Sequence, residues 1–429
     1  MFALFLISAK RFAGLAWGAL TRSPDGAAPL CARRVLVMLG FLPVFTFGQA
    51  LHWLGFLLDD LLFRGWRKVR IDAPLFVLGV PRSGTTRLHQ VLARDRQFTT
   101  FRTWECLFAP SVTQRLFFRA VGRLDAAIGR PGTRLLRWLE RQIFGGLDDI
   151  HPMGLETPEE DYFALMPVLS CFILALPFPG FEHIWRFGRF DAALSERERR
   201  RLLDFYESCL KRHLYAHGGK RLLSKNAAFA PLALSLAERF PDARFIVALR
   251  DPLETVPSQL SSIGDGLAFF GVPADSAPVR ERLIAQLSFY YENLERLQQR
   301  LPAERHAVIG MAELRGHLGA TLSAIYARFG LAVDADFAAV LTVEDRQSRQ
   351  YRSAHRYDLA QFGLTPEMIA ERFAAAYRHP ALADGRVADA APPGAGGNVA
   401  EPEPEPGRGS GTAERHRHAA PIEPNSEAA

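Results

Sequence analysis

The sequence predicts an α/β fold in three layers, with a central parallel sheet between two layers of helices. Three uninterrupted apolar runs carry this prediction, because strands buried on both faces of a parallel sheet do not alternate with polar residues. They are LFVLGV from Leu75, RFIVAL from Arg244 and HAVIG from His306. Helical spacing fills residues 85–94, 230–239, 279–300 and 318–329. Since ligands bind at the carboxyl ends of such strands, we expect the site beyond the first two runs.

An N-terminal apolar segment, residues 1–70, precedes this fold. Residues 35–58 carry no formal charge over 24 positions, which is long enough to cross a bilayer. Basic residues flank both ends, so the positive-inside rule gives no orientation. An interfacial helical pair or a buried helix would show the same pattern. We therefore predict membrane association, with the active domain in the cytoplasm, and leave open whether the segment spans the bilayer.

The charge of the chain is unevenly distributed. The net charge is +6 over 429 residues, but residues 381–429 hold four Arg against eight Asp or Glu, so the remainder carries 6 + 4 = +10. This tail is rich in Pro, Gly and Glu, which predicts disorder and limits the folded domain to residues 71–380. A basic body suits anionic ligands or an anionic membrane. The sequence has no basic-aromatic motif or recognised binding module, so we do not expect a nucleic-acid partner.

The four cysteines indicate neither a metal site nor a disulfide framework. Cys31, Cys106, Cys171 and Cys209 lie far apart, without a CxxC pair or a histidine at metal-ligand spacing,. Free thiols in a reducing compartment are the simplest interpretation, and two disulfides are the alternative. We therefore expect no metal.

A phosphate-binding loop follows the first apolar run. Gly79, four further residues and then Gly84-Thr85-Thr86 have P-loop spacing, but Thr85 replaces the usual lysine and the charge lies at Arg82,. Loss of that lysine argues against hydrolysis of ATP or GTP and favours a donor with a shorter charged chain, such as a phosphosulfate. The backbone amides from Arg82 through Ser83 to Thr86 and the following helix N-terminus would bind its 5′-phosphate.

Four segments in order resemble the sulfotransferases that use 3′-phosphoadenosine 5′-phosphosulfate (PAPS), particularly the bacterial type related to the tyrosylprotein branch. They are PRSGTT at 81–86, SKNAAFAPL at 224–232, FPDARFIVALRDPLETVPSQLSS at 240–262 and HRYDLAQFGLTPEMIAERF at 355–373. The resemblance implies a P-loop-type fold and sulfuryl transfer from PAPS to an alcohol or phenol. It also implies that Arg250 and Ser258 bind the 3′-phosphate of the donor, and that Lys225 stabilises the transition state.

Transfer to a hydroxyl also needs a base and positive charge on the leaving oxygen. Arg82 and Lys225 are the candidates for that charge. Glu105 is the predicted base, because it follows the first strand and helix and because the resemblance places a catalytic Glu there. The alternatives are His151, Glu156 and Glu160. Thr157-Pro158 with Glu160 forms a capping-box pattern, so we predict that Glu160 satisfies a helix end.

The acceptor is not encoded in a motif. Residues 165–185 are apolar and aromatic, and they predict either core or a pocket for a hydrophobic alcohol. Together with the N-terminal apolar segment, this favours a lipid-linked or hydrophobic acceptor. Two other functions fit less well, namely a P-loop kinase acting on a small molecule and a non-catalytic membrane-associated scaffold.

Overall fold

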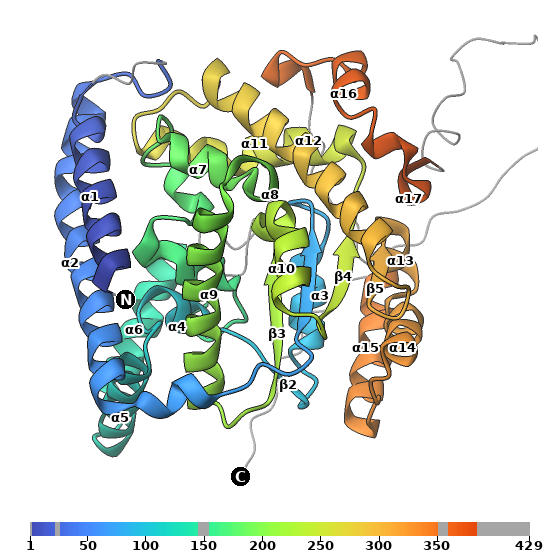
Figure 1. Cartoon of the computed structure of the whole chain (residues 1–429), viewed down its shortest axis with the longest axis horizontal. Helices are drawn as coiled ribbons and strands as arrows, with labels where there is room; N and C mark the ends of the chain where they lie inside the picture. Colours follow the sequence, from blue (N-terminus) through green and yellow to red (C-terminus); the bar gives the residue numbers. More distant parts are fainter. Residues whose placement is uncertain (1, 22–25, 145–153, 351–358, 384–429) are drawn as a thin grey trace, which may run out of the picture. The chain divides into compact units, whose positions relative to one another are not determined.

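The protein is described by a computed structural model over residues 2–21, 26–144, 154–350 and 359–383. Its centre is a sheet of five parallel strands in the order β2-β3-β1-β4-β5 (Figure 1). The strands are β1 (Leu75–Gly79), β2 (Phe98–Thr99), β3 (Arg221–Asn226), β4 (Arg244–Ala248) and β5 (His306–Ile309). In register, Val77 lies opposite Lys225 of β3 and Ile246 of β4.

The two faces of the sheet pack into separate cores, as the alternation of side chains along a strand requires. Leu75 and Val77 of β1 belong to one core, whereas Phe76 and Leu78 belong to the other. The first core is covered by α3 (Thr85–Leu92), α13 (Met311–Gly316), α14 (Leu318–Phe329) and α15 (Ala335–Gln350). The second is covered by α9 (Glu196–Ala216), η4 (Ala227–Leu232), α10 (Ala233–Arg239), α11 (Pro252–Phe269) and α12 (Ala277–Arg300). The result is three layers around a buried sheet.

The second core continues into irregular and short helical segments. These are η2 (Asp161–Val168), η3 (Phe172–Ala175), α7 (Glu182–Phe187) and α8 (Phe190–Ala193) on one side, and η5 (Leu359–Phe362), α16 (Pro366–Arg372), η6 (Ala376–Arg378) and α17 (Pro380–Ala383) on the other. Most of the apolar side chains between Leu165 and Trp185 are buried in this core.

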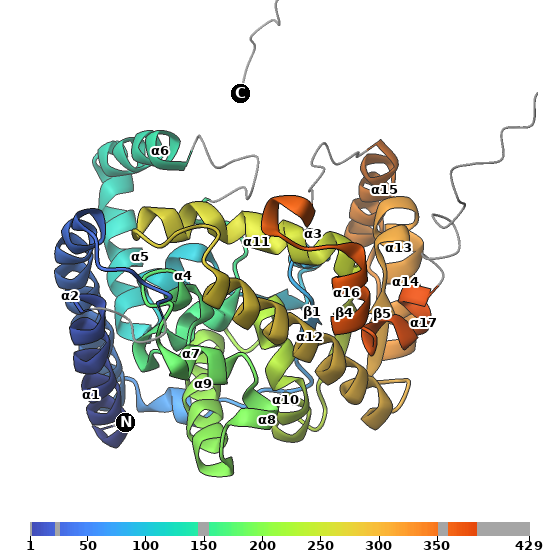
Figure 2. The ribbon, with the colours of Figure 1, turned by 90° about the horizontal axis from the view of Figure 1, so that it is seen from above.

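A set of helices lies beside the second core, on the side away from α13 to α17 in both views (Figures 1 and 2). It consists of α1 (Phe2–Ala19), α2 (Ala32–Leu62), η1 (Arg64–Lys68), α4 (Thr103–Leu107), α5 (Val112–Ala127) and α6 (Pro131–Phe144). By length and composition, α1 and α2 could each cross a membrane. Among the four cysteines, only Cys31 is exposed, and all four are free thiols as predicted.

The predicted fold class is confirmed, as are the three apolar strands. Three predicted helices correspond to α3, α12 and α14, and α14 ends at Gly330, which has a φ of +62° as expected of a helix stop,. The fourth, predicted at 230–239, begins as the 3₁₀ helix η4 and continues as α10. Two strands were missed: β2 has only two residues, and the end of β3 is polar. Beyond residue 383, the predicted tail lies outside the described residues.

The predicted capping box at Thr157 is wrong. The Thr157 hydroxyl donates back to the carbonyl of Gly154, 2.6 Å away, and no α-helix begins at Pro158. Instead, this segment runs beside residues 101–104, with the Glu159 amide 2.9 Å from the carbonyl of Phe101. Backbone pairing with a segment more than 50 positions away overrides the local capping pattern, so the Glu160 side chain does not cap a helix.

Candidate functional site

The phosphate loop begins where β1 ends and is shaped by unusual backbone angles. Arg82 and Gly84 have φ values of +66° and +80°. The left-handed conformation is costly for a residue with a side chain, and such strain concentrates at ligand-binding sites. A Cβ at Gly84 would also lie 2.7 Å from Leu314, so glycine is required there on both grounds,. The loop therefore has a fixed shape, and it ends at the N-terminus of α3.

The hydroxyl groups of the loop have different environments. Ser83 is buried, and its hydroxyl donates to the carbonyl of Val80 at 2.6 Å, which closes the loop. The side chain of Thr85 is also buried. Thr86 is partly exposed, and its hydroxyl lies 3.2 Å from Nζ of Lys225. Thr86 therefore connects the loop to β3.

The two arginines predicted to bind the donor meet at this loop. Nε of Arg82 donates to the Ser258 hydroxyl of α11 at 3.0 Å, and the Arg250 guanidinium donates to the carbonyl of Arg82 at 2.9 Å. Arg82, Arg250 and Ser258 are thus brought together from the ends of β1 and β4 and from α11. This is the edge of the sheet where ligands bind in open α/β folds.

The position of Arg250 is fixed by the residues behind it. Its carbonyl accepts a hydrogen bond from the buried Tyr291 hydroxyl at 2.6 Å. Its side chain pairs with the half-exposed Glu254 at 2.6 Å. Asp251 does not pair with Arg250, because its carboxylate caps α11 at the Leu253 amide, 2.8 Å away. The backbone of Arg250 is therefore held in place, while its guanidinium contacts the Arg82 carbonyl and the half-exposed Glu254.

Lys225 is the third cation at the site. It lies on β3 with only 3 % of its side chain exposed, and its Nζ is 2.6 Å from the carboxylate of Glu160 and 3.2 Å from the Thr86 hydroxyl. A buried ammonium group requires such a partner. Glu160, which the sequence analysis assigned to a helix end, is therefore connected to the phosphate loop through Lys225 and Thr86.

A buried network positions Glu160. The next residue, Asp161, accepts hydrogen bonds from the hydroxyls of Tyr206 at 2.5 Å and Ser224 at 2.9 Å, and a short one from the Asn226 amide. Asn226 in turn accepts from the backbone amide of Tyr162 at 2.9 Å. These bonds tie the start of η2 to the end of β3, where Lys225 lies. They therefore fix the distance between Glu160 and Lys225.

Asp161 should make stability depend on pH. Burial raises its pKa to about 6 from an ordinary value of 3.8, against the opposing effect of its three hydrogen-bond donors. The protonated form is favoured in the folded state, so its stabilising contribution is complete below about pH 4 and is lost as the pH rises through 6. Between pH 4 and 7 we expect the free energy of unfolding of the wild type to fall by an amount on the order of 2–3 kcal/mol because of Asp161. Asp161→Asn should not show this fall. The measurement is the melting temperature of both proteins between pH 4 and 7.

Asp161→Asn also loses one hydrogen-bond acceptor. This loss changes the stability of the variant by the same amount at every pH, so it does not alter the slope of stability against pH. Melting profiles of the two proteins that run parallel over this range would contradict the assignment.

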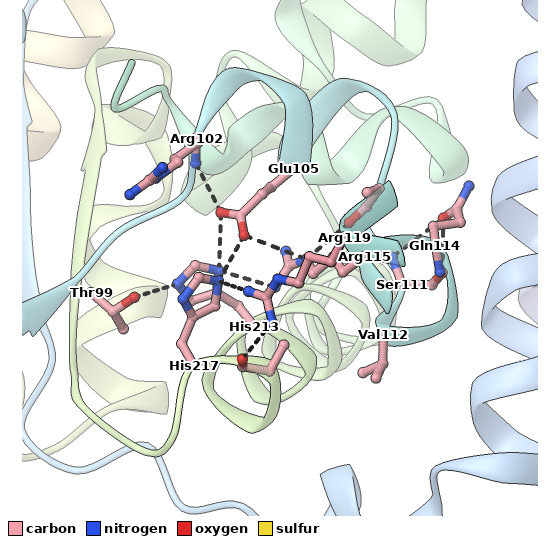
Figure 3. Close-up of polar contacts among 12 residues, drawn as sticks. Thr99, Arg102, Glu105, Ser111, Val112, Gln114, Arg115, Arg119, His213 and His217 are labelled. Atoms are coloured by element: carbon pink, nitrogen blue, oxygen red, sulfur yellow. Dashed lines mark hydrogen bonds and ion pairs between the residues drawn. The ribbon is translucent and has the colours of Figure 1, made fainter. Parts of the chain in front are cut away.

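Glu105 lies in a different environment from the one predicted for a base. Figure 3 shows its carboxylate pointing toward the rings of His213 on α9 and His217 just after α9, and toward the guanidinium of Arg115. One oxygen is 2.7 Å from Nε2 of His217, and the other lies 3.7 Å from Nδ1 of His213 and accepts from the Arg102 amide at 3.1 Å. The carboxylate thereby joins α4 to α5 and α9.

The charge of Glu105 is strongly stabilised. Burial raises its pKa, but the hydrogen bond to His217 and the charges of Arg115, His213 and His217 outweigh burial and hold the pKa well below its usual range. A carboxylate with so low a pKa is a weak proton acceptor at neutral pH. The contacts of Glu105 and its lowered pKa thus favour a structural role over the predicted role as base.

The same trio, Glu105, His213 and His217, has donor atoms within 4.8 Å of one another, which is compatible with metal binding. However, Nδ1 of His213 lies 3.1 Å from the Arg115 guanidinium, and its Nε2 lies 3.0 Å from the Thr99 hydroxyl. Both ring nitrogens thus have protein partners, and a buried cation already occupies the cluster. We interpret it as a hydrogen-bond network between helices.

The structure thus brings together the predicted transition-state lysine, Lys225, and all of the predicted donor-binding residues, which are Arg82, Ser83, Gly84, Thr85, Thr86, Arg250 and Ser258. Among the described residues, the hydrogen bonds and ion pairs of Glu105 go to Arg102, Arg115, His213 and His217 and not to this group. His151 lies outside the described residues. Glu160 was an alternative base that the sequence analysis assigned to a helix end, and Asp161 was missed. The signal was the run of three acids, Glu159 to Asp161, directly ahead of a buried apolar segment.

Comparison with known proteins gives a consistent result. Residues 74–335 match the model of the sulfotransferase family. Among curated relatives, the omega-hydroxy-beta-dihydromenaquinone-9 sulfotransferases Stf3 of Mycobacterium bovis and Mycobacterium tuberculosis are 25% identical over 306 residues, covering 70% of this chain and 72% of theirs.

Two crystal structures share the fold. They are sulfotransferase STF9 from Mycobacterium avium, with a TM-score of 0.65, 18% identity and coverage of 88% of this chain and 96% of that one, and STF1 from Mycobacterium tuberculosis, with a TM-score of 0.61, 20% identity and coverage of 87% and 98%. At this level of identity, they are evidence of the fold alone.

Proposed function

The chain belongs to the sulfotransferase family, and from this premise we propose that it transfers the sulfuryl group of PAPS to a hydroxyl of a hydrophobic, lipid-linked acceptor. The observation that carries this proposal is the convergence of Arg82, Arg250 and Lys225 at the phosphate loop. Three cations at one loop match a donor with separate 5′-phosphosulfate and 3′-phosphate groups.

The donor would be divided between two groups of residues. The amides of residues 82–86 and the N-terminus of α3 would bind the 5′-phosphosulfate. Arg250 and Ser258 would bind the 3′-phosphate, the group that ATP lacks, for which a guanidinium offers paired donors. Arg250 can bind a phosphate without losing a buried ion pair, since its acidic partner among the described residues is the half-exposed Glu254.

Lys225 and Glu160 would carry the chemistry. In the transfer, the acceptor oxygen forms a bond to sulfur, the bond from sulfur to the bridging oxygen breaks, and 3′-phosphoadenosine 5′-phosphate (PAP) leaves. Lys225 and Arg82 stabilise the charge on that oxygen. We propose Glu160 as the base that takes the acceptor proton, in place of Glu105 and His151, because Glu160 contacts the lysine.

A hydrophobic acceptor is supported by two observations. The curated relatives are named for sulfation of a hydroxylated dihydromenaquinone. In this chain, Glu160 directly precedes η2, whose apolar residues share a core with those of α1 and α2. The site is therefore connected by packing to α1 and α2, which both expose large apolar side chains. We propose that the protein is membrane-associated, with its active domain in the cytoplasm, where free thiols persist.

The proposal is tested by incubating the full chain with [³⁵S]PAPS and three acceptor classes: a hydroxylated prenyl quinol, a tyrosine peptide and a free sugar. We expect labelling of the lipid alcohol alone. Labelling of the peptide or sugar in its place would contradict the proposed acceptor, and labelling from [γ-³²P]ATP would contradict the reaction.

A further inference from the structure

The N-terminal helices are fixed to the globular domain at both ends of α2. Near its start, the buried Arg34 donates to the carbonyls of Phe270 at 3.1 Å and Pro177 at 3.0 Å. Near its end, the buried Asp59 forms an ion pair with Arg212 at 2.9 Å and accepts from the amides at the start of α5. At ~1.5 Å per residue, these anchors lie about 38 Å apart along the helix.

This spacing excludes a transmembrane α2 with the domain in water. The hydrocarbon core of a bilayer is about 30 Å thick, so a helix that crosses it would place one of the two anchors on the far side. Between the two anchors, α2 makes further contacts with the domain: Phe41 packs on Phe270, and His52 forms a hydrogen bond with Gln114 of α5. The helix must therefore lie alongside the domain.

The opposite face of α2 is apolar and exposed. Its outward side chains recur at helical spacing, and Leu36, Val44 and Phe47 are 74%, 72% and 66% exposed. The stripe continues through Leu51, Leu54, Leu57 and Leu61. Soluble proteins rarely expose an apolar stripe of this length to water, so this face is suited to an apolar environment.

Helix α5, which packs against α2, also has an exposed apolar face. It directs Arg115 and Arg119 inward, toward His213 and the carbonyl of Ala216. Its outward residues are Phe117, Val121, Leu124 and Ile128, spaced by four, three and four positions and all exposed. This is an amphipathic helix with its polar side toward the protein and its apolar side outward.

The charge around these stripes is positive. Between residues 112 and 138 the sequence has six Arg and one Asp. That Asp125 caps α6, with its oxygens 2.6 Å from the Gly132 amide and 2.9 Å from that of Thr133. Exposed arginines beside exposed apolar side chains are typical of helices that lie in the interface of an anionic bilayer; they are Arg123, Arg130, Arg134 and Arg137.

We propose that the protein is monotopic: α1 and α2 lie along one leaflet without crossing it, and α5 with the start of α6 forms a second docking element that binds anionic lipid. The outward stripes enter the acyl boundary, and the arginines contact the headgroups. This inference rests on the surface and its anchors, and it holds whether or not the site transfers sulfuryl groups.

Flotation measures the docking element. The full chain is synthesised in a cell-free system with vesicles of phosphatidylcholine, with or without phosphatidylglycerol. We expect Phe117→Glu with Leu124→Glu to reduce the floated fraction at least tenfold, and Arg134→Glu with Arg137→Glu to abolish the preference for the anionic vesicles, since each juxtamembrane arginine contributes about fivefold in affinity. Val343→Glu, at an exposed apolar position of α15, is the matched control and should float normally.

Flotation that is the same for all these variants would overturn the docking element. So would a change from dimer to monomer in the α5 variant without loss of flotation, because the occupant would then be a second copy of the chain.

Cysteine labelling measures the topology. Cys31 is exposed at the start of α2, and the other three cysteines are buried. Wild type is compared with Cys31→Ser/Lys68→Cys, which moves the reactive thiol beyond the far end of the helix, using a membrane-impermeant maleimide on right-side-out and inverted vesicles. We expect both thiols to react from the same side, whereas reaction from opposite sides would show that α2 spans the membrane and would overturn the proposal.

Discussion

Glu160→Gln should lower the kcat for sulfuryl transfer about a hundredfold to ten-thousandfold, the usual contribution of a general base. The amide keeps the shape of the side chain and an oxygen that can accept from Lys225 at the observed position, but it cannot take a proton. Donor binding should change little, because the loop, Arg250 and Ser258 are untouched. The measurements are steady-state kcat and KM, with PAP affinity determined separately.

Two other glutamates serve as comparisons. Glu156 lies in the same segment, is exposed and pairs with Arg102, so Glu156→Gln should leave kcat within a few-fold of wild type. Glu105→Gln leaves Arg115 buried without its acidic partner, so it should lower the melting temperature strongly while the folded fraction keeps its turnover. If Glu105→Gln removes turnover without destabilisation and Glu160→Gln remains active, Glu105 is the base.

Arg250→Ala should weaken PAP binding about tenfold to a hundredfold, because hydrogen bonds to a charged group contribute roughly 1.5–3 kcal/mol. AMP, which has no 3′-phosphate, should bind the variant and wild type alike. The comparison between the two ligands is needed because Arg250 also donates to the Arg82 carbonyl. Isothermal titration calorimetry with each ligand gives the difference directly.

Glu254→Gln provides the matched control for Arg250. It removes the ion pair but leaves the arginine in place, so PAP should bind at least as tightly as to wild type. Equal losses of PAP and AMP affinity in Arg250→Ala would assign the arginine to the shape of the loop and not to the 3′-phosphate.

The sequence was sufficient for the centre of the fold because β1 and β4 are buried on both faces and contain only apolar residues along their buried length. β3 was not recognisable, because its last residues, Ser224, Lys225 and Asn226, are polar and yet buried. These residues are polar because they form the site. The functional end of β3 therefore lacks the apolar pattern by which a buried strand is recognised.

The candidate site was predictable on the donor side and not on the acceptor side. The phosphate loop and the arginine after β4 are local patterns that follow strands. Glu160 depends on pairing between residues 101–104 and 155–159, and on Asp161 bonding to β3, which local patterns do not show. Similarly, the position of Glu105 after the first strand and helix favoured a base, but its histidine partners at the end of α9 come more than 100 positions later.

The proposed membrane-docking helices were also only partly predictable from the sequence. The apolar run of α2 was evident in the sequence, but α5 alternates Arg with Phe and Leu and was not singled out. Its spacing predicts an amphipathic helix without saying which face is buried. Only the contacts of Arg115 and Arg119 show that the polar face is the inner one.

In the proposed function, the loop and Arg250 bind the adenosine bisphosphate portion of PAPS. Calorimetric titration of the purified full chain with PAP, ATP and AMP tests it most directly. We predict micromolar binding of PAP, with weaker binding of AMP and little of ATP, because the loop lacks the lysine that a triphosphate requires and the 3′-phosphate has its own arginine. Preference for ATP, or no binding of PAP, would show that the loop and Arg250 do not form a PAPS site.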